Sequence, residues 1–188
     1  HGHGHELAHA GQDPTPELVA GWHHNLLEGL SYVPAPCYRG AYRGSAHPWL
    51  RDYEVEIRGL LGPCPGVAAH QVADALERYF SELVQRIHAL EQSLPRLPDK
   101  SHDDVQKVAA LAAWAHGEWV RIHPFANGNG RTARLLANYV LARFCLLPVV
   151  RLRPRPDYPY GLIAEFSMKG QHELAQAWIL SLLEAASS

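Results

Sequence analysis

Apolar residues recur every three or four positions along most of the chain, which is the spacing of amphipathic helices. The clearest run extends from Val72 to Leu90 and predicts a helix of about six turns. A second long helix is predicted from Ser101, whose hydroxyl can cap it, to His123. The residues after Gly130 keep the helical spacing but are nearly all apolar, so we expect a central, buried helix there.

Shorter elements complete the predicted architecture. Thr15-Pro16-Glu17 is typical of a helix start, and this first helix should end near Gly29. Two further helical patterns lie at about 160–168 and 173–184. The Pro- and Gly-rich region from Val33 to Pro65 contains one strand-like piece, Tyr53-Glu54-Val55-Glu56-Ile57. The prediction is an all-α helical bundle with a small β-hairpin.

Composition narrows the function classes. With 188 residues, 47% apolar and 19% charged, the chain fits one folded domain over 15–188, preceded by a flexible His-rich tail over 1–14. The net charge of -2 provides no field that would attract nucleic acid or an anionic membrane. We found neither a long apolar run nor a signal peptide, so we expect a cytoplasmic protein without nucleic-acid or membrane partners.

Cysteines and terminal histidines offer little chemistry. Three widely spaced cysteines fit neither a disulfide framework nor a zinc site. Four histidines among the first nine residues could bind a transition metal, although such Gly-spaced histidines are more often part of a mobile tail.

The stretch His-Pro-Phe-Ala-Asn-Gly-Asn-Gly-Arg-Thr-Ala-Arg, residues 123–134, concentrates the candidate chemistry. A Gly-rich turn between two helices exposes backbone N–H groups at the start of the second helix, which favours an anion. Gly128 and Gly130 could take positive φ there. Arg131 and Arg134 are three residues apart, so both guanidinium groups can reach one face. A plain helix-helix turn and a capping histidine are the alternatives for the separate fragments.

Taken together, these twelve residues closely resemble the motif H-P-F-x-(D/E)-G-N-G-R-x-x-R of the Fic (filamentation induced by cAMP) family. This family transfers a nucleoside monophosphate, usually AMP from ATP, to hydroxyl side chains of proteins. The segment Cys-Tyr-Arg-Gly-Ala-Tyr-Arg at 37–43 is similar to the family sequence that leads into a target-binding flap. The resemblance also includes Arg-Pro-Asp-Tyr-Pro-Tyr at 155–160, and spans about 15–185.

The resemblance implies a role for each motif position. His123 would be the general base, with a pKa of about 6.5 that leaves a neutral fraction at cytosolic pH. Phe125 would anchor the loop in the core. The implied nucleotide site consists of Gly128, Asn129 and Gly130 as an anion hole, Arg131 and Arg134 on the β- and γ-phosphates, and Tyr158 and Tyr160 on the adenine side. Tyr53, Glu54, Val55, Glu56 and Ile57 would form the flap and align a target backbone by strand addition.

One position departs from the family motif. Asn127 stands where the family has the acidic residue that binds Mg²⁺, so a neutral carbonyl oxygen replaces a charged ligand. We expect Mg²⁺, or Mn²⁺, to be bound more weakly by this chain, with ATP as co-substrate. The related Doc branch, which transfers phosphate, carries lysine where this chain has Gly130, and this argues against the Doc substrate orientation.

The sequence therefore favours a protein adenylyltransferase that modifies a Ser, Thr or Tyr hydroxyl of a target protein. A second possibility keeps the fold and His123 but uses UTP, GTP or a phosphate-linked donor. A third is a weakly active, nucleotide-binding toxin-antitoxin module. An antitoxin-like inhibitor and a homo-oligomer are possible partners. The stretch His24–Gly29 matches the family's inhibitory motif except at its first residue, and we assign it to the first core helix instead.

Overall fold

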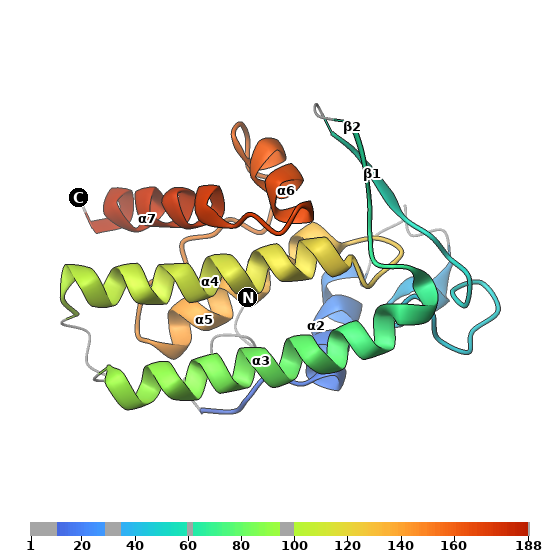
Figure 1. The fold of residues 1–188 in the computed structure, drawn as a ribbon, viewed down its shortest axis with the longest axis horizontal. Coiled ribbons are helices and arrows are strands. Elements are labelled where there is room, and N and C mark those ends of the chain that lie inside the picture. The colour runs from blue at the N-terminus through green and yellow to red at the C-terminus, as the bar shows by residue number, and fades with distance from the viewer. Residues whose placement is uncertain (1–10, 29–34, 60–61, 95–99, 188) are drawn as a thin grey trace.

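The computed structural model describes residues 11–28, 35–59, 62–94 and 100–187 (Figure 1). Six α-helices and one two-stranded antiparallel sheet lie within these residues. The α-helices are α2 (Pro16–Leu27), α3 (Val72–Ser93), α4 (His102–Ile122), α5 (Asn129–Arg143), α6 (Tyr160–Met168) and α7 (Glu173–Ser187). The strands are β1 (Glu56–Gly59) and β2 (Gly62–Pro65), and two 3₁₀ turns are η1 (Pro36–Tyr38) and η2 (Ala69–Gln71). The predicted helical bundle with a small hairpin is confirmed.

Helix α4 is the centre of the arrangement, because it packs against α3, α5, α6 and α7. Figure 1 shows α4 lying between α3 on one side and α7 on the other, with the hairpin rising beside α6. Helix α5 is buried along nearly its whole length, as its apolar sequence predicts. Among the described residues, no helix is both long and apolar enough to cross a membrane.

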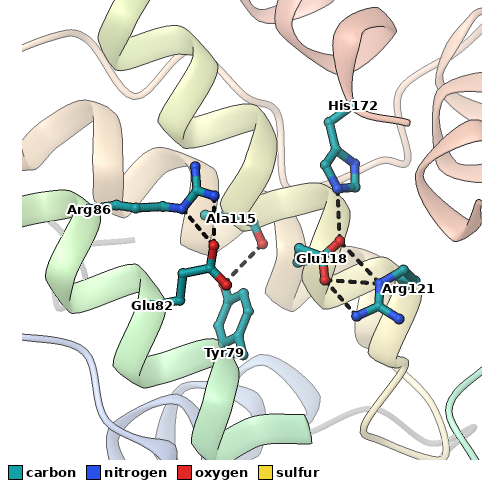
Figure 2. A network of polar contacts seen from close by, with 7 residues as sticks. All are labelled: Tyr79, Glu82, Arg86, Ala115, Glu118, Arg121 and His172. Carbon is teal, nitrogen blue, oxygen red and sulfur yellow. Dashed lines mark hydrogen bonds and ion pairs between the residues drawn. The ribbon is translucent and has the colours of Figure 1, made fainter. Parts of the chain in front are cut away.

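Polar groups on the buried helices have specific partners. Asn138 on α5 donates to the carbonyl of Val150 at 2.8 Å and accepts from its N–H at 2.9 Å, so the amide replaces a strand partner for the segment that follows α5. On α4, Glu118 accepts from Arg121 and lies 2.9 Å from Nε2 of His172, at the approach to α7 (Figure 2). Although burial opposes ionisation, these hydrogen bonds lower the pKa of Glu118 to about 2. The contact between Glu118 and His172 therefore holds the start of α7 against α4.

The residues directly before α2 are fixed to the domain. The hydroxyl of Tyr139 and the guanidinium of Arg143 both donate to the carbonyl of Gln12, and Arg143 pairs with Asp13 at 3.2 Å. Long-range contacts to α5 therefore hold Gln12 and Asp13, which lie at the C-terminal end of the predicted tail over 1–14. The four terminal histidines, and the metal interpretation attached to them, lie outside the described residues.

Helix ends follow the predicted capping chemistry. Oγ1 of Thr15 accepts from the N–H of Leu18 at 3.2 Å, and α2 begins at Pro16. At α4, Oγ of Ser101 accepts from the N–H of Asp104, whose carboxylate accepts from the N–H of Ser101, both at 3.2 Å. This reciprocal pair satisfies two N–H groups at the start of the helix that leads to the histidine motif.

The hairpin lies three residues further along than its sequence pattern predicts. Strand β1 begins at Glu56 and pairs with β2 from Glu56↔Pro65 to Gly59↔Gly62. Tyr53, Glu54 and Val55 precede it, so the predicted strand over Tyr53–Ile57 is wrong for these three. The carbonyl of Tyr53 accepts from Arg43 rather than from a strand, and the carboxylate of Glu54 accepts from the N–H of Ala69 at 2.9 Å. These residues form the base of the hairpin.

The contact between the hairpin and α6 is unusually close at Gly59. A Cβ placed on Gly59 would lie 2.3 Å from the carboxyl carbon of Glu165, which is buried on α6. The absence of a side chain at Gly59 therefore allows β1 to approach α6.

Replacing the capping hydroxyl in Ser101→Ala should lower the free energy of unfolding by about 1 kcal/mol, because the N–H of Asp104 loses its acceptor. Urea unfolding followed by circular dichroism measures this change. Asp103→Ala, in the same exposed first turn but outside the capping pair, should cost less than half as much. Equal losses of unfolding free energy in the two variants would mean that the Ser101 hydroxyl contributes no more to stability than the charge of Asp103.

Candidate active site

The motif loop, the hairpin and the segment before α6 enclose one cavity of about 1130 Å³. From the motif, its lining includes His123, Asn127, Gly128, Gly130, Arg131 and Arg134. The hairpin contributes Ile57, Arg58 and Gly59, and the later chain contributes Leu152, Arg153, Arg155–Tyr158, Tyr160, Gly161 and Glu165 among others. The structure thus gathers most of the predicted site residues, together with arginines that the motif does not contain.

His123 ends α4 in the left-handed conformation, with φ 54° and ψ 54°, which turns the chain into the loop. Its Nδ1 lies 3.1 Å from the carbonyl oxygen of Val120. A carbonyl can only accept, so the proton is on Nδ1 and the lone pair is on Nε2. Burial lowers the pKa of His123 to about 4, with Arg43 adding to the effect. Burial therefore moves this pKa below the reference value near 6.5, and the ring is neutral throughout the physiological range.

Asn129 holds the loop rather than facing the cavity. Its Oδ1 accepts from the N–H of Phe125 at 2.9 Å, and its Nδ2 donates to the carbonyl of Phe125 at 2.7 Å. Asn129 is 2% exposed and does not line the cavity, so the implied anion-hole role is left to its backbone N–H. Phe125 is fully buried, and its ring stacks on those of His23 and Tyr42.

His23 on α2 is a loop-positioning residue that the sequence does not reveal. Its Nδ1 accepts from the N–H of Gly40 at 2.9 Å, so Nε2 carries the proton and donates to the carbonyl of Asn127 at 2.8 Å. Burial lowers its pKa to about 4. Its loop partner is 104 positions away in the chain, so no local pattern indicates this role.

Arg43 connects the loop to the hairpin. Its side chain donates to the carbonyls of His123, Tyr53 and Val67, each at 2.8 Å, and its carboxylate partner is Glu54 at 3.6 Å. Its own N–H donates to the carbonyl of Pro124 at 2.8 Å. One buried cation therefore fixes the chain on both sides of the cavity.

The start of α5 forms the polar end of the cavity. Gly128 precedes the helix with φ 81°, as predicted, and a Cβ there would lie 2.9 Å from Nε2 of His23. Gly130 is already helical, so the predicted positive φ is wrong at that position. The first turn of α5 directs backbone N–H groups and the positive end of the helix dipole towards this end of the cavity.

Arg131 and Arg134 both line the cavity, in line with the predicted shared face. Arg134 is 3% exposed, donates to the carbonyl of Leu152 at 2.9 Å, and has no partner for Nε. Its guanidinium carbon lies 5.0 Å from the ring centre of Tyr160. A buried guanidinium of this kind is stabilised by an anion.

The two tyrosines predicted on the adenine side have different surroundings. Tyr158 is 86% exposed on the cavity lining. Tyr160 is 2% exposed, and its hydroxyl lies 3.0 Å from Nε2 of His116 and donates to the carbonyl of Gly130 at 3.4 Å. Tyr160 therefore supports the start of α5, and its surroundings differ from those of Tyr158.

Asn127 does not provide the donor set of a magnesium site. Its side chain is exposed, and Oδ1 accepts from the N–H of Gly128 at 2.6 Å. Proteins usually hold Mg²⁺ through one or two carboxylates together with substrate phosphates. Within the described ranges, no three His, Cys, Asp or Glu side chains are grouped as metal ligands. The predicted metal role of Asn127 does not fit this arrangement.

Comparison with known proteins identifies one family and relatives that share a single name. The model of the Fic/DOC family matches residues 13–141. "Protein adenylyltransferase Fic" of Nematostella vectensis is 54% identical over 49 residues, covering 26% of this chain and 12% of the relative. The protein of the same name in Drosophila melanogaster is 43% identical over 61 residues, covering 32% of this chain and 12% of the relative. The matched stretches are thus a small part of either relative's length.

The neutral, buried histidines should make stability depend on pH. The pKa values of His23, His116 and His123 are lowered to about 4, 3 and 4, mainly by burial. Below pH 6.5 the unfolded chain takes up protons that the folded chain does not. The free energy of unfolding should therefore fall by up to about 1.4 kcal/mol per pH unit for each histidine. Urea titrations between pH 7.5 and 4.5 measure this, and a flat profile would contradict the burial argument.

Gly128→Ala should lower the free energy of unfolding by about 1–3 kcal/mol, because alanine is strained at positive φ and its Cβ meets His23. The control is Gly130→Ala, whose Cβ would make ordinary contacts at 3.4 Å and 3.6 Å. That variant should keep its stability or gain up to about 1 kcal/mol. Thermal and urea unfolding compare the two, and equal losses would show that the backbone conformation at Gly128 is unimportant.

Proposed function

Because this chain belongs to the Fic/DOC family, we propose that it is a protein adenylyltransferase that transfers AMP from ATP to a hydroxyl side chain of a target protein. The observation that carries the proposal is the shared cavity of His123 and Arg134. A histidine with its lone pair on Nε2 and the buried guanidinium of Arg134, which donates to the carbonyl of Leu152, line the same space. A proton acceptor and a polyanion site are the two groups that this transfer needs.

In the proposed reaction, the target hydroxyl oxygen attacks the α-phosphorus of ATP. A new oxygen–phosphorus bond forms, the bond to the β-phosphate bridging oxygen breaks, and pyrophosphate leaves. Nε2 of His123 takes the hydroxyl proton. The pKa of the free ring is about 4, but a bound polyphosphate favours the imidazolium and raises this pKa, so the base becomes stronger as the substrate binds.

Charge stabilisation comes from the start of α5. Its N–H groups and dipole favour the negative charge that develops on the transferred and leaving phosphates. Arg131 and Arg134 line the same end of the cavity and can form charge-assisted bonds with the leaving group. His23 and Arg43 act by holding the loop carbonyls that set the position of these groups.

The hairpin is the proposed docking edge for the target. Ile57, Arg58 and Gly59 line the cavity, so a peptide laid along β1 would place a side chain near His123. β1 is one strand of a two-stranded sheet in the described chain, and its outer edge can accept a further strand. Tyr53 and Glu54 belong to the base of the hairpin and support this edge without pairing.

Magnesium enters no step of this mechanism, because the donor set at Asn127 does not fit it. The same observation favours a second candidate function, a nucleotide-binding module with little turnover that acts in a toxin-antitoxin pair. Other donors, UTP, GTP or a phosphate-linked metabolite, are variants of the first proposal. A cytoplasmic location, an antitoxin-like inhibitor and self-association are further proposals from the sequence.

Mass spectrometry of intact protein and peptides tests the transfer, after incubation with ATP, UTP or GTP and a host lysate as target source. A nucleoside monophosphate increment from ATP is expected, and His123→Ala should reduce its rate at least about 100-fold. His102→Ala, an exposed histidine outside the cavity, should leave the rate unchanged. Nucleotide binding without any increment, in both the parent and His123→Ala, would instead support the binding module.

A further inference from the structure

The cavity has more positive charge than the family motif brings to it. Besides Arg131 and Arg134, its lining includes Arg58 on the hairpin and, from the segment before α6, Arg153 and Arg155. Two carboxylates also line it. One of these, Asp157, is paired with Arg151 at 3.2 Å.

The other carboxylate is directed to the hairpin. Glu165 is 3% exposed, and its carboxylate lies against Gly59 of β1. Neither acidic residue is therefore grouped with Asn127 as a replacement metal ligand. The cavity lining therefore has more arginine side chains than carboxylates, and its net charge is positive.

Arg134 and Arg155 flank the same aromatic ring. Their guanidinium carbons lie 5.0 Å and 5.6 Å from the ring centre of Tyr160. In the described chain, neither of them has an Asp or Glu within ion-pair distance. Two like charges brought to one ring repel each other, and a polyanion that contacts both removes this repulsion.

The ring between them is firmly held. Tyr160 is 2% exposed, its hydroxyl lies 3.0 Å from Nε2 of the fully buried His116, and it donates to the carbonyl of Gly130. Both guanidinium groups are therefore placed relative to the start of α5, where the phosphate chain is expected. Arg155 lies outside the motif, in the segment that joins α5 to α6.

We propose that this cavity binds a polyphosphate chain without a divalent cation, and that Arg155 supplies the positive charge that a carboxylate-held cation would otherwise provide. The occupant under the proposed function is the triphosphate of ATP. Asn127 presents a neutral oxygen that already accepts from the N–H of Gly128, whereas guanidinium groups bind phosphate oxygens in fork geometry. A bound cation would also be repelled by the arginine lining.

Isothermal titration calorimetry tests the proposal with two probes, inorganic tripolyphosphate and ATP, each in EDTA and in excess Mg²⁺. The parent should bind both probes in EDTA at least as tightly as in Mg²⁺, because Mg²⁺ neutralises the ligand without gaining a protein carboxylate. Asn127→Asp should reverse this order. Mg²⁺ that tightens binding to the parent by about tenfold or more, a gain of about 1.4 kcal/mol, would overturn the proposal.

Arg155→Gln tests the arginine itself. It should weaken binding of both probes in EDTA by at least about tenfold, and circular dichroism should be unchanged because Arg155 is exposed. The matched control is Arg78→Gln, which removes the same charge from an exposed position of α3 outside the cavity. Equal binding by the two variants would overturn the role of Arg155.

The two probes separate this proposal from the proposed function. Tripolyphosphate that binds in EDTA through Arg155, together with an absence of nucleotide transfer in the mass spectra, would leave the polyanion site standing and remove adenylyl transfer. Transfer of AMP by a parent that binds tripolyphosphate in neither EDTA nor Mg²⁺ would leave adenylyl transfer standing and remove the polyanion site.

Discussion

The buried guanidinium of Arg43 is the interaction on which the cavity depends. Burying a cation costs several kcal/mol unless its hydrogen bonds are satisfied, and here the acceptors are backbone carbonyls of His123, Tyr53 and Val67 together with the nearby Glu54. The hairpin joins Tyr53 to Val67, and the long helices α3 and α4 separate both of them from His123 in the chain. Because all of them must converge to satisfy one side chain, the left-handed turn at His123 and the base of the hairpin are positioned together, and the cavity between them has a defined shape.

The helices could be predicted because their determinants are local. Apolar spacing, the Thr15 and Ser101 caps and the apolar run after Gly130 each act within a few turns, and the observed α2, α4 and α5 follow them. The hairpin start could not be predicted, since Tyr53–Val55 have a strand-like sequence but their oxygens accept hydrogen bonds from Arg43, Ala69 and Gly66, and such contacts form only in the folded chain. Most candidate site residues were found because they are contiguous in one motif, whereas His23 acts across the fold and has no local signal. The lowered pKa of His123 likewise follows from burial that only the packed domain creates.

The span that identifies the family and the cavity that it helps to build do not coincide. The family match ends at residue 141, inside α5. The cavity also depends on Leu152, Arg155 and Tyr160, which follow that match. The matched part brings His123, the N-terminus of α5 and three lining arginines, including Arg58, and the later part brings the aromatic support together with Arg153 and Arg155. The positive charge of this cavity is therefore divided between residues that the family model covers and a segment that it does not cover.

At Gly59, the position of the hairpin is set separately from the position of the groups that the proposed reaction uses. The height of the hairpin above the cavity is set where β1 meets Glu165, and the closeness of that contact depends on a missing methyl group. None of the groups that move protons or hold phosphates takes part in it. Under the proposed function, a single substitution at position 59 would tilt the proposed docking edge while leaving the reactive groups in place, so the choice of target protein could change during evolution, or be redesigned, independently of the chemistry.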